Sequence, residues 1–183
     1  MACTFGWTEE KNKRMDIVMI AAHSENGVIG KAGGLPWDMP ADEAFFLHEI
    51  KGCFLLSGRK SYESNQGNSI FQDKAYVIIT RQEDYEPGPG GQVAHSVEAG
   101  IELAQDKGVP RLCVLGGGEI YRQVMPYADR LILTTIHTHV GDGDAFFPDI
   151  DPDKWTLFQQ EAHKADGDNP FPYTFNWYRR AQG

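Results

Sequence analysis

The chain has 183 residues, of which 41% are hydrophobic and 23% charged. This composition is typical of one compact globular domain and not of a disordered segment. The formal net charge of −9, from 26 acidic and 17 basic residues, argues against nucleic acid or an anionic membrane as the main partner. Because no apolar stretch approaches the roughly 18 residues that span a bilayer, we expect a soluble, cytoplasmic protein.

The predicted elements begin after a polar, aperiodic start, so we interpret residues 1–14 as an N-terminal tail and residues 15–183 as a single domain. Short apolar runs predict strands at Ile17–Ala22, Cys53–Ser57, Ala75–Thr80, Arg111–Leu115 and Arg130–Ile136. Helix signals alternate with them at Pro40–Lys51, Val97–Lys107 and Glu119–Tyr127. This alternation predicts an α/β fold with a mostly parallel sheet. The last two runs, Trp155–Gln160 and Tyr173–Arg179, are joined by a polar turn without a helix, so they should pair antiparallel at one edge.

We expect neither a disulfide nor a metal site. The three cysteines, Cys3, Cys53 and Cys113, are an odd number, and two of them lie in strand-like runs, which favours small buried thiols. The acidic loop 141–149 lacks the glycine and the glutamate of an EF-hand. The six histidines show no metal-ligand spacing.

Ligands of open α/β sheets bind beyond the carboxyl ends of the strands, and the segment Asn26–Phe46 follows the first predicted strand. Its Asp42 stands in the first turn of a predicted helix, where the helix dipole alone favours an acid. Asp42 also shares a helix face with Phe46, and Leu35–Trp37 could close over that face. A carboxyl so enclosed has a raised pKa and can donate a proton near neutral pH. Both interpretations of Asp42 stand at this point.

Two further features could serve a phosphate-bearing ligand. Gly116–Gly118 follow a predicted strand and precede a helix, where free N–H groups suit a pyrophosphate. Tyr121 takes the place of the last glycine in the dinucleotide-binding fingerprint, and a tight turn would explain the glycines equally well. Arg59, Lys60 and Arg81 also follow strand ends; they are either ordinary surface cations or a pocket for an extra phosphate.

Eight ordered motifs resemble the dihydrofolate reductase family over about residues 15–180. They are IAA (Ile20–Ala22), NGVIG (Asn26–Gly30), LPW (Leu35–Trp37), PAD followed by Phe46, GRKSYES (Gly58–Ser64), LGGGEIY (Leu115–Tyr121), LTTI (Leu133–Ile136) and GDAFFPD (Gly143–Asp149). The resemblance implies a three-layer α/β fold with a mostly parallel central sheet, an antiparallel C-terminal edge and helices on both faces. It also implies a monomeric, NADPH-dependent reductase of one-carbon metabolism. Such an enzyme passes a hydride to a C=N bond, and reduction of 7,8-dihydrofolate to tetrahydrofolate is the family default.

The resemblance also assigns roles to residues. Asp42 would bind the N–C–N edge of the pterin and promote its protonation, Thr134 would support Asp42 by a hydrogen bond, and Trp37 would close the site and hold a water beside Asp42. The substrate would be bound along Ile20, Ala21, Glu43, Phe46, Asn65, Phe71, Lys74, Leu115 and Tyr121. NADPH would contact Ala22, Ile29, Gly30, Arg59, Lys60, Ser61, Thr80, Arg81, Gly116, Gly117, Gly118, Glu119, Ile120 and Tyr121.

Four positions depart from the family pattern, three of them on the path of the substrate's tail. Lys74 stands where the family has an arginine for the α-carboxylate of the glutamate tail, and lysine offers a point charge in place of a bidentate fork. Glu43 and Asn65 stand where apolar side chains are usual. Ala145 replaces a small hydroxyl residue, which puts the usual hydrogen bonding between two loops in question.

These departures leave three functions open. The first is a true dihydrofolate reductase in which Lys74 supplies enough charge and Glu43 turns to solvent. The second is a related reductase of a non-folate cyclic imine, iminium or hemiaminal, as in natural-product modification, detoxification or self-resistance. The third is a non-catalytic folate- or nucleotide-binding relative, which the presence of both Asp42 and Thr134 disfavours.

Overall fold

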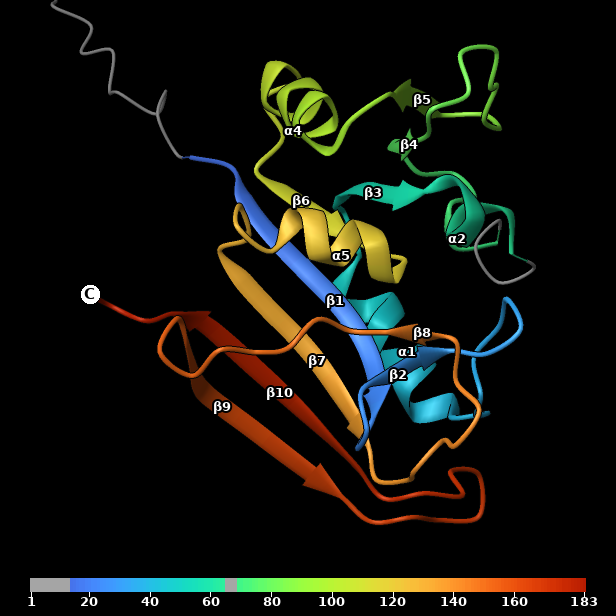
Figure 1. Ribbon diagram of the computed structural model, residues 1–183, viewed down its shortest axis with the longest axis vertical. Coiled ribbons are helices and arrows are strands. Elements are labelled where there is room, and N and C mark those ends of the chain that lie inside the picture. The colour runs from blue at the N-terminus through green and yellow to red at the C-terminus, as the bar shows by residue number, and fades with distance from the viewer. Residues whose placement is uncertain (1–13, 65–68) are drawn as a thin grey trace, which may run out of the picture.

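The protein is built around a twisted eight-stranded sheet in the order β5-β4-β3-β6-β1-β7-β10-β9 (Figure 1). A computed structural model describes residues 14–64 and 69–183. The strands are β1 (Asp16–Ser24), β2 (Val28–Gly30), β3 (Phe54–Gly58), β4 (Tyr76–Ile79), β5 (Gly91–Ala94), β6 (Arg111–Val114), β7 (Arg130–Ile136), β8 (Ala145–Phe146), β9 (Trp155–His163) and β10 (Tyr173–Arg180). The helices are α1 (Pro40–Glu49), α2 (Arg59–Glu63), α4 (Val97–Asp106) and α5 (Gly118–Val124).

Helices cover both faces of the sheet, because the side chains of a strand alternate between its two faces. On β1, Met19 joins the apolar cluster that contains Ile101 of α4 and Val124 of α5. Its neighbour Ile20 joins a second cluster, against which Phe46 of α1 packs. The predicted three-layer α/β architecture is thereby confirmed.

The C-terminal edge is antiparallel, as predicted. The strands from β5 to β7 pair in parallel, while β10 runs antiparallel to both β7 and β9. Figure 1 shows β10 and β9 together at one side of the sheet. The parallel strands therefore present their carboxyl ends at a common edge, and this is where the sequence places its candidate site.

Four short elements differ from the prediction. Neither α2 nor the strands β2, β5 and β8 were expected, because they span only two to five residues, too few to show a periodic pattern. The helix predicted at 119–127 ends at Val124, shortly before Pro126. Among the described residues, no helix combines the length and the apolar character needed to cross a membrane. The predicted substrate residue Asn65 lies outside the described residues.

Candidate active site

Asp42 lies in the first turn of α1, beside the middle of the sheet. It is 8% exposed, and its carboxyl is hydrogen-bonded to Thr134 of β7, which is 2% exposed. Thr134 pairs with Ala22 of β1, so these two strands hold the hydroxyl donor to Asp42 and the expected nicotinamide contact side by side. Burial raises the pKa of Asp42 from 3.8 to about 6; the negative charge of Glu43 adds to the rise and the Thr134 hydrogen bond opposes it. Because this pKa lies close to neutral pH, the Asp42 carboxyl can take up and release a proton under neutral conditions.

Trp37 precedes the first turn of α1 by three residues. Its side chain is buried and belongs to an apolar cluster with Met39, Ile136 and Phe175. The indole Nε1 is buried and has no hydrogen-bond partner among residues 14–64 and 69–183. A buried N–H without a partner is costly, so this atom is suited to a water or ligand atom held between Trp37 and its surroundings.

The predicted ring pocket is only partly assembled from the side chains that were expected. Ile20 belongs to the apolar cluster on the α1 face, and Phe46 and Leu115 pack against this cluster, which also contains the buried Phe71. Ala21 belongs instead to the cluster on the opposite face. Because adjacent strand residues point to opposite faces, the Ala21 side chain cannot line a pocket with Ile20, and only its backbone can face the ring.

The glycine turn after β6 packs tightly against its surroundings. A Cβ on Gly116 would lie 2.9 Å from the ring of Tyr121, and a Cβ on Gly118 would lie 2.9 Å from the backbone oxygen of Phe146, whereas Gly117 has open space. The Tyr121 hydroxyl donates a 2.6 Å hydrogen bond to the carbonyl of Ile20, and burial raises its pKa. The turn thus leaves free space beside the half-buried backbone of Gly117 for the close approach of a phosphate.

Two other residues after this turn lie differently. Ile120 is buried against Gly58, at 2.9 Å from the position of a Cβ there. Glu119 is exposed and forms an ion pair with Arg122 and a 3.0 Å hydrogen bond with Gln123. Of the two, Ile120 therefore shapes the turn, while the Glu119 side chain faces solvent.

The predicted cationic edge is brought together by β3 and β4, which pair at Gly58 and Ile79. The carboxyl ends of these strands carry Arg59, Lys60 and Ser61 on one side and Thr80 and Arg81 on the other. Lys60 and Arg81 are exposed, and Arg59 forms a 2.9 Å ion pair with Glu63. The exposed side chains of Lys60 and Arg81 can therefore bind a phosphate at this edge without breaking an existing ion pair.

Sequence reasoning missed His95, which lies at this same edge. His95 follows β5, and its Nδ1 is 2.8 Å from the carbonyl of Thr80. No sequence signal identified it, because the preceding strand at Gly91–Ala94 spans only four residues.

The two loops near Ile29 and Gly30 are joined in spite of Ala145. The Asp144 carboxylate accepts a 2.9 Å hydrogen bond from the Ala32 N–H, and the Asp144 N–H donates to the Gly30 carbonyl at 3.0 Å. Lys31 adds an ion pair with Asp142 at 2.5 Å. Backbone groups and Asp144 therefore make these bonds between the loops without a hydroxyl at position 145.

The tail path carries two lysines. Lys74 lines a pocket of about 460 Å³ together with Leu47 and Lys51 near the end of α1. Glu43, on the first turn of the same helix, is exposed. The pocket is also lined by Asp73, so an anionic group in it would meet two lysines and one carboxylate, while Glu43 can remain in water.

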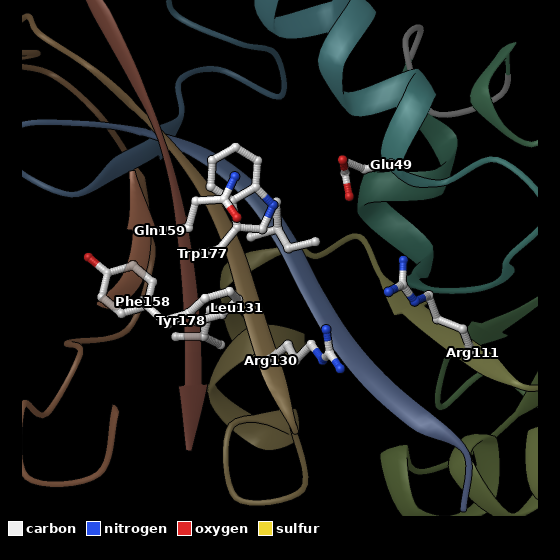
Figure 2. A pocket seen from close by; sticks show the side chains of 9 residues that line it. Glu49, Arg111, Arg130, Leu131, Phe158, Gln159, Trp177 and Tyr178 are labelled. Atoms are coloured by element: carbon white, nitrogen blue, oxygen red, sulfur yellow. The ribbon is translucent and has the colours of Figure 1, made fainter. Parts of the chain in front are cut away.

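A further cavity of about 200 Å³ lies at the opposite end of the sheet, with Glu49 and Arg111 on one side and Trp177 on the other (Figure 2). It contains none of the predicted site residues. Arg111 and Arg130, which line it, both lie near the Asp16 carboxylate, at 3.7 and 3.3 Å. Because these guanidinium groups already have an anionic partner, this cavity is a weaker candidate than the Asp42 region.

Comparisons with known proteins identify the family. The family model for dihydrofolate reductase matches residues 16–180. A dihydrofolate reductase of Bacillus subtilis is 34% identical over 165 residues, covering 90% of this chain and 94% of the relative. One from Neisseria meningitidis serogroup A is 38% identical over 166 residues, with 91% and 99% covered. Among solved structures, dihydrofolate reductase from Enterococcus faecalis complexed with NADP(H) and RAB-propyl has a TM-score of 0.82 and 32% identity, with 91% and 97% covered.

Proposed function

The chain belongs to the dihydrofolate reductase family, and on that premise we propose that it reduces 7,8-dihydrofolate to tetrahydrofolate with NADPH. The observation that carries the proposal is the buried Asp42 carboxyl, bonded to Thr134 and with a pKa raised to about 6. Reduction of a C=N bond requires a proton at nitrogen, and a carboxyl with this pKa serves as a proton source near neutral pH.

Different residues of the chain bind the substrate, promote its protonation and exclude solvent. Asp42 binds the N–C–N edge of the pterin and promotes protonation of the imine nitrogen, and Thr134 fixes the Asp42 carboxyl. Trp37 holds a water through its unpaired Nε1 and excludes bulk solvent from the acid. Ile20, Phe46 and Leu115 hold the apolar faces of the ring.

NADPH supplies the hydride when it is bound. The open backbone at Gly117 fits its pyrophosphate, and the cations after β3 and β4 fit its 2′-phosphate. Tyr121 fixes the backbone of Ile20 through the 2.6 Å hydrogen bond and so shapes the wall between the cofactor and the ring. Ala22, Ile29 and Gly30 lie on β1 and β2, where they would enclose the nicotinamide.

Two features of the tail path favour dihydrofolate over a non-folate imine. Lys74 shares its pocket with Lys51, which provides two positive charges for the carboxylates of a glutamate tail. Glu43 is exposed, so its charge does not have to be desolvated when the substrate binds. Even with Asp73 in the same pocket, the two lysines leave a net positive charge in place of the family's arginine.

We further infer that residues 15–183 act as one domain, as a monomer in the cytoplasm. Cys53 and Cys113 are free thiols, and a reducing compartment keeps such thiols reduced.

The test is NADPH oxidation with 7,8-dihydrofolate, followed in the steady state and in a single turnover. Wild type should turn over dihydrofolate, and Asp42→Asn should lose about 10²- to 10⁴-fold in hydride transfer, since general acid catalysis is typically worth that much. Asp38→Asn is the matched control, because Asp38 is an exposed carboxylate four residues earlier; it should keep the wild-type rate.

Wild-type protein that binds NADPH but leaves dihydrofolate unreduced would contradict the proposal. Reduction of simple cyclic imines by the same preparation would then assign the site to a non-folate substrate, and no turnover on either class would indicate a binding protein.

A further inference from the structure

Helix α1, which carries Asp42, begins without a capping side chain of its own. The residue at its N-cap is Met39, whose side chain makes no capping hydrogen bond. Pro40 at the first helical position has no N–H, and the N–H groups of Asp42 and Glu43 donate to the Met39 carbonyl at 3.0 and 3.1 Å. This leaves the Ala41 N–H as the donor that a capping side chain would normally satisfy.

The missing acceptor comes from the loop between β9 and β10. Oδ1 of Asn169 accepts the Ala41 N–H at 2.9 Å, across 128 residues of sequence. Asn169 is only 5% exposed, which is unusual for an asparagine in a loop. Its burial at the helix start indicates that this contact is part of the fold and not a chance surface contact.

Asn169 is itself held rigidly by Asp166. The Asp166 carboxylate accepts from the Asn169 backbone N–H at 2.8 Å and from Nδ2 at 2.9 Å, as well as from the Asp168 N–H at 2.9 Å. The Asp166 N–H donates back to the Asn169 carbonyl at 2.9 Å. A carboxylate can only accept and an N–H can only donate, so the amide orientation is determined: Nδ2 faces Asp166 and Oδ1 faces α1.

We propose that Asn169 is a positioning residue for Asp42, which supplies from a distant loop the cap that fixes the first turn of α1 and thereby the acid. The inference rests on the proposed function, in which Asp42 promotes protonation of the substrate. Asp42 is the residue directly after the capped Ala41, so a loosened first turn moves its carboxyl away from Thr134. It also admits water to a side chain that is now buried.

The consequence is electrostatic as well as geometric. Burial is the main reason that the pKa of Asp42 stands near 6. The groups that face Asp42 are Thr134 and Glu43, and Tyr173 of β10 lies within electrostatic reach of both Asp42 and Asp166. Loss of the cap should lower the pKa of Asp42 towards its ordinary value, because the carboxyl gains water while these neighbours stay in place.

The test combines four variants. Asn169→Ala removes the acceptor, and Asp166→Ala removes the carboxylate that holds the Asn169 side chain in place. Asp166→Asn is the conservative variant, because its amide oxygen can still accept from the Asp168 N–H, the Asn169 N–H and Asn169 Nδ2. Asp168→Ala is the control, since its exposed side chain takes no part in the cap. The ¹³C chemical shift of the Asp42 carboxyl is titrated in each protein without substrate, with Asp42→Asn giving the assignment.

Asn169→Ala and Asp166→Ala should lower the pKa of Asp42 and slow hydride transfer by about tenfold, within the roughly 10²-fold loss that a misplacement of about 1 Å can cause. Asp166→Asn should keep both close to wild type, the control should change neither, and the Kd for NADPH should stay constant throughout. An unchanged Asp42 titration in Asn169→Ala and Asp166→Ala, with only a lower Tm, would overturn the proposal. Failure of wild type to reduce dihydrofolate would refute the proposed function alone, because the titration needs no substrate.

Discussion

Replacing Asp42 by asparagine should stabilise the folded protein while it disables the reaction. Burial raises the pKa of Asp42 from 3.8 to about 6 in the folded state, whereas the unfolded chain leaves the carboxyl in water. The difference corresponds to a cost of about 3 kcal/mol when the group is ionised at high pH. Asparagine has nearly the same shape and carries no charge, so it avoids this cost.

The sign of the pH dependence follows from linkage. Because the folded-state pKa is the higher of the two, Asp42 contributes stability that is complete below pH 3.8 and is lost as the pH rises through about 6. The stability advantage of Asp42→Asn should therefore grow with pH, by about 1.5 kcal/mol between pH 5 and pH 8. Urea unfolding of both proteins at these two pH values measures the change directly, since all other titrating groups cancel.

An advantage of Asp42→Asn that is the same at pH 5 and pH 8 would refute this reasoning. It would show that the carboxyl is not buried in the folded protein, or that the Thr134 hydrogen bond compensates its ionised form. Asp38→Asn, on an exposed position of the preceding loop, should show no pH-dependent difference and reports any general effect of removing one negative charge.

Three further changes have defined outcomes. Lys74→Arg should lower the KM for dihydrofolate, since a guanidinium binds a carboxylate with two hydrogen bonds, and Lys74→Ala should raise it about tenfold; unchanged KM values in steady-state assays would remove Lys74 from the tail path. Tyr121→Phe should cost about 1–3 kcal/mol in urea unfolding, because the carbonyl of Ile20 loses its 2.6 Å donor in a buried place. Asp144→Ala should speed dissociation of NADPH in stopped-flow experiments, because the Ala32 N–H loses its acceptor and the two loops separate more readily.

The sequence predicted the elements that form the body of the sheet and missed those that join its loops. The strand Arg130–Ile136 was predicted with the bounds that the structure has, because its apolar, β-branched run admits few alternatives. The strands at Val28–Gly30 and Ala145–Phe146 exist because they pair with one another across the two loops. Such pairing is a tertiary event, and segments of two or three residues leave no periodicity to detect it.

The site shows the same division between local and distant causes. The resemblance grouped Asp42 with Thr134, and the structure brings these two side chains together; both positions are carried by ordered motifs. Asn169 had no such signal: its role depends on the partner Ala41, 128 residues away, and locally it resembles any polar turn residue. Lys51 was missed for a similar reason, since only the packing of α1 brings it to the pocket of Lys74.

Asp42 finally shows which of two physical effects governs the helix start. An acid in the first turn is favoured by the helix dipole by about 0.3–1 kcal/mol, or up to about 2 kcal/mol when partly buried, and this effect alone would lower its pKa. The pKa is instead raised to about 6, with burial as the largest cause. Desolvation therefore outweighs the dipole at this position, and the first turn of α1 holds a carboxyl in a form that costs stability at neutral pH. Buried carboxyls that cost stability in this way are expected where the fold serves a reaction, and Asn169 supplies from outside the helix the cap that this first turn requires.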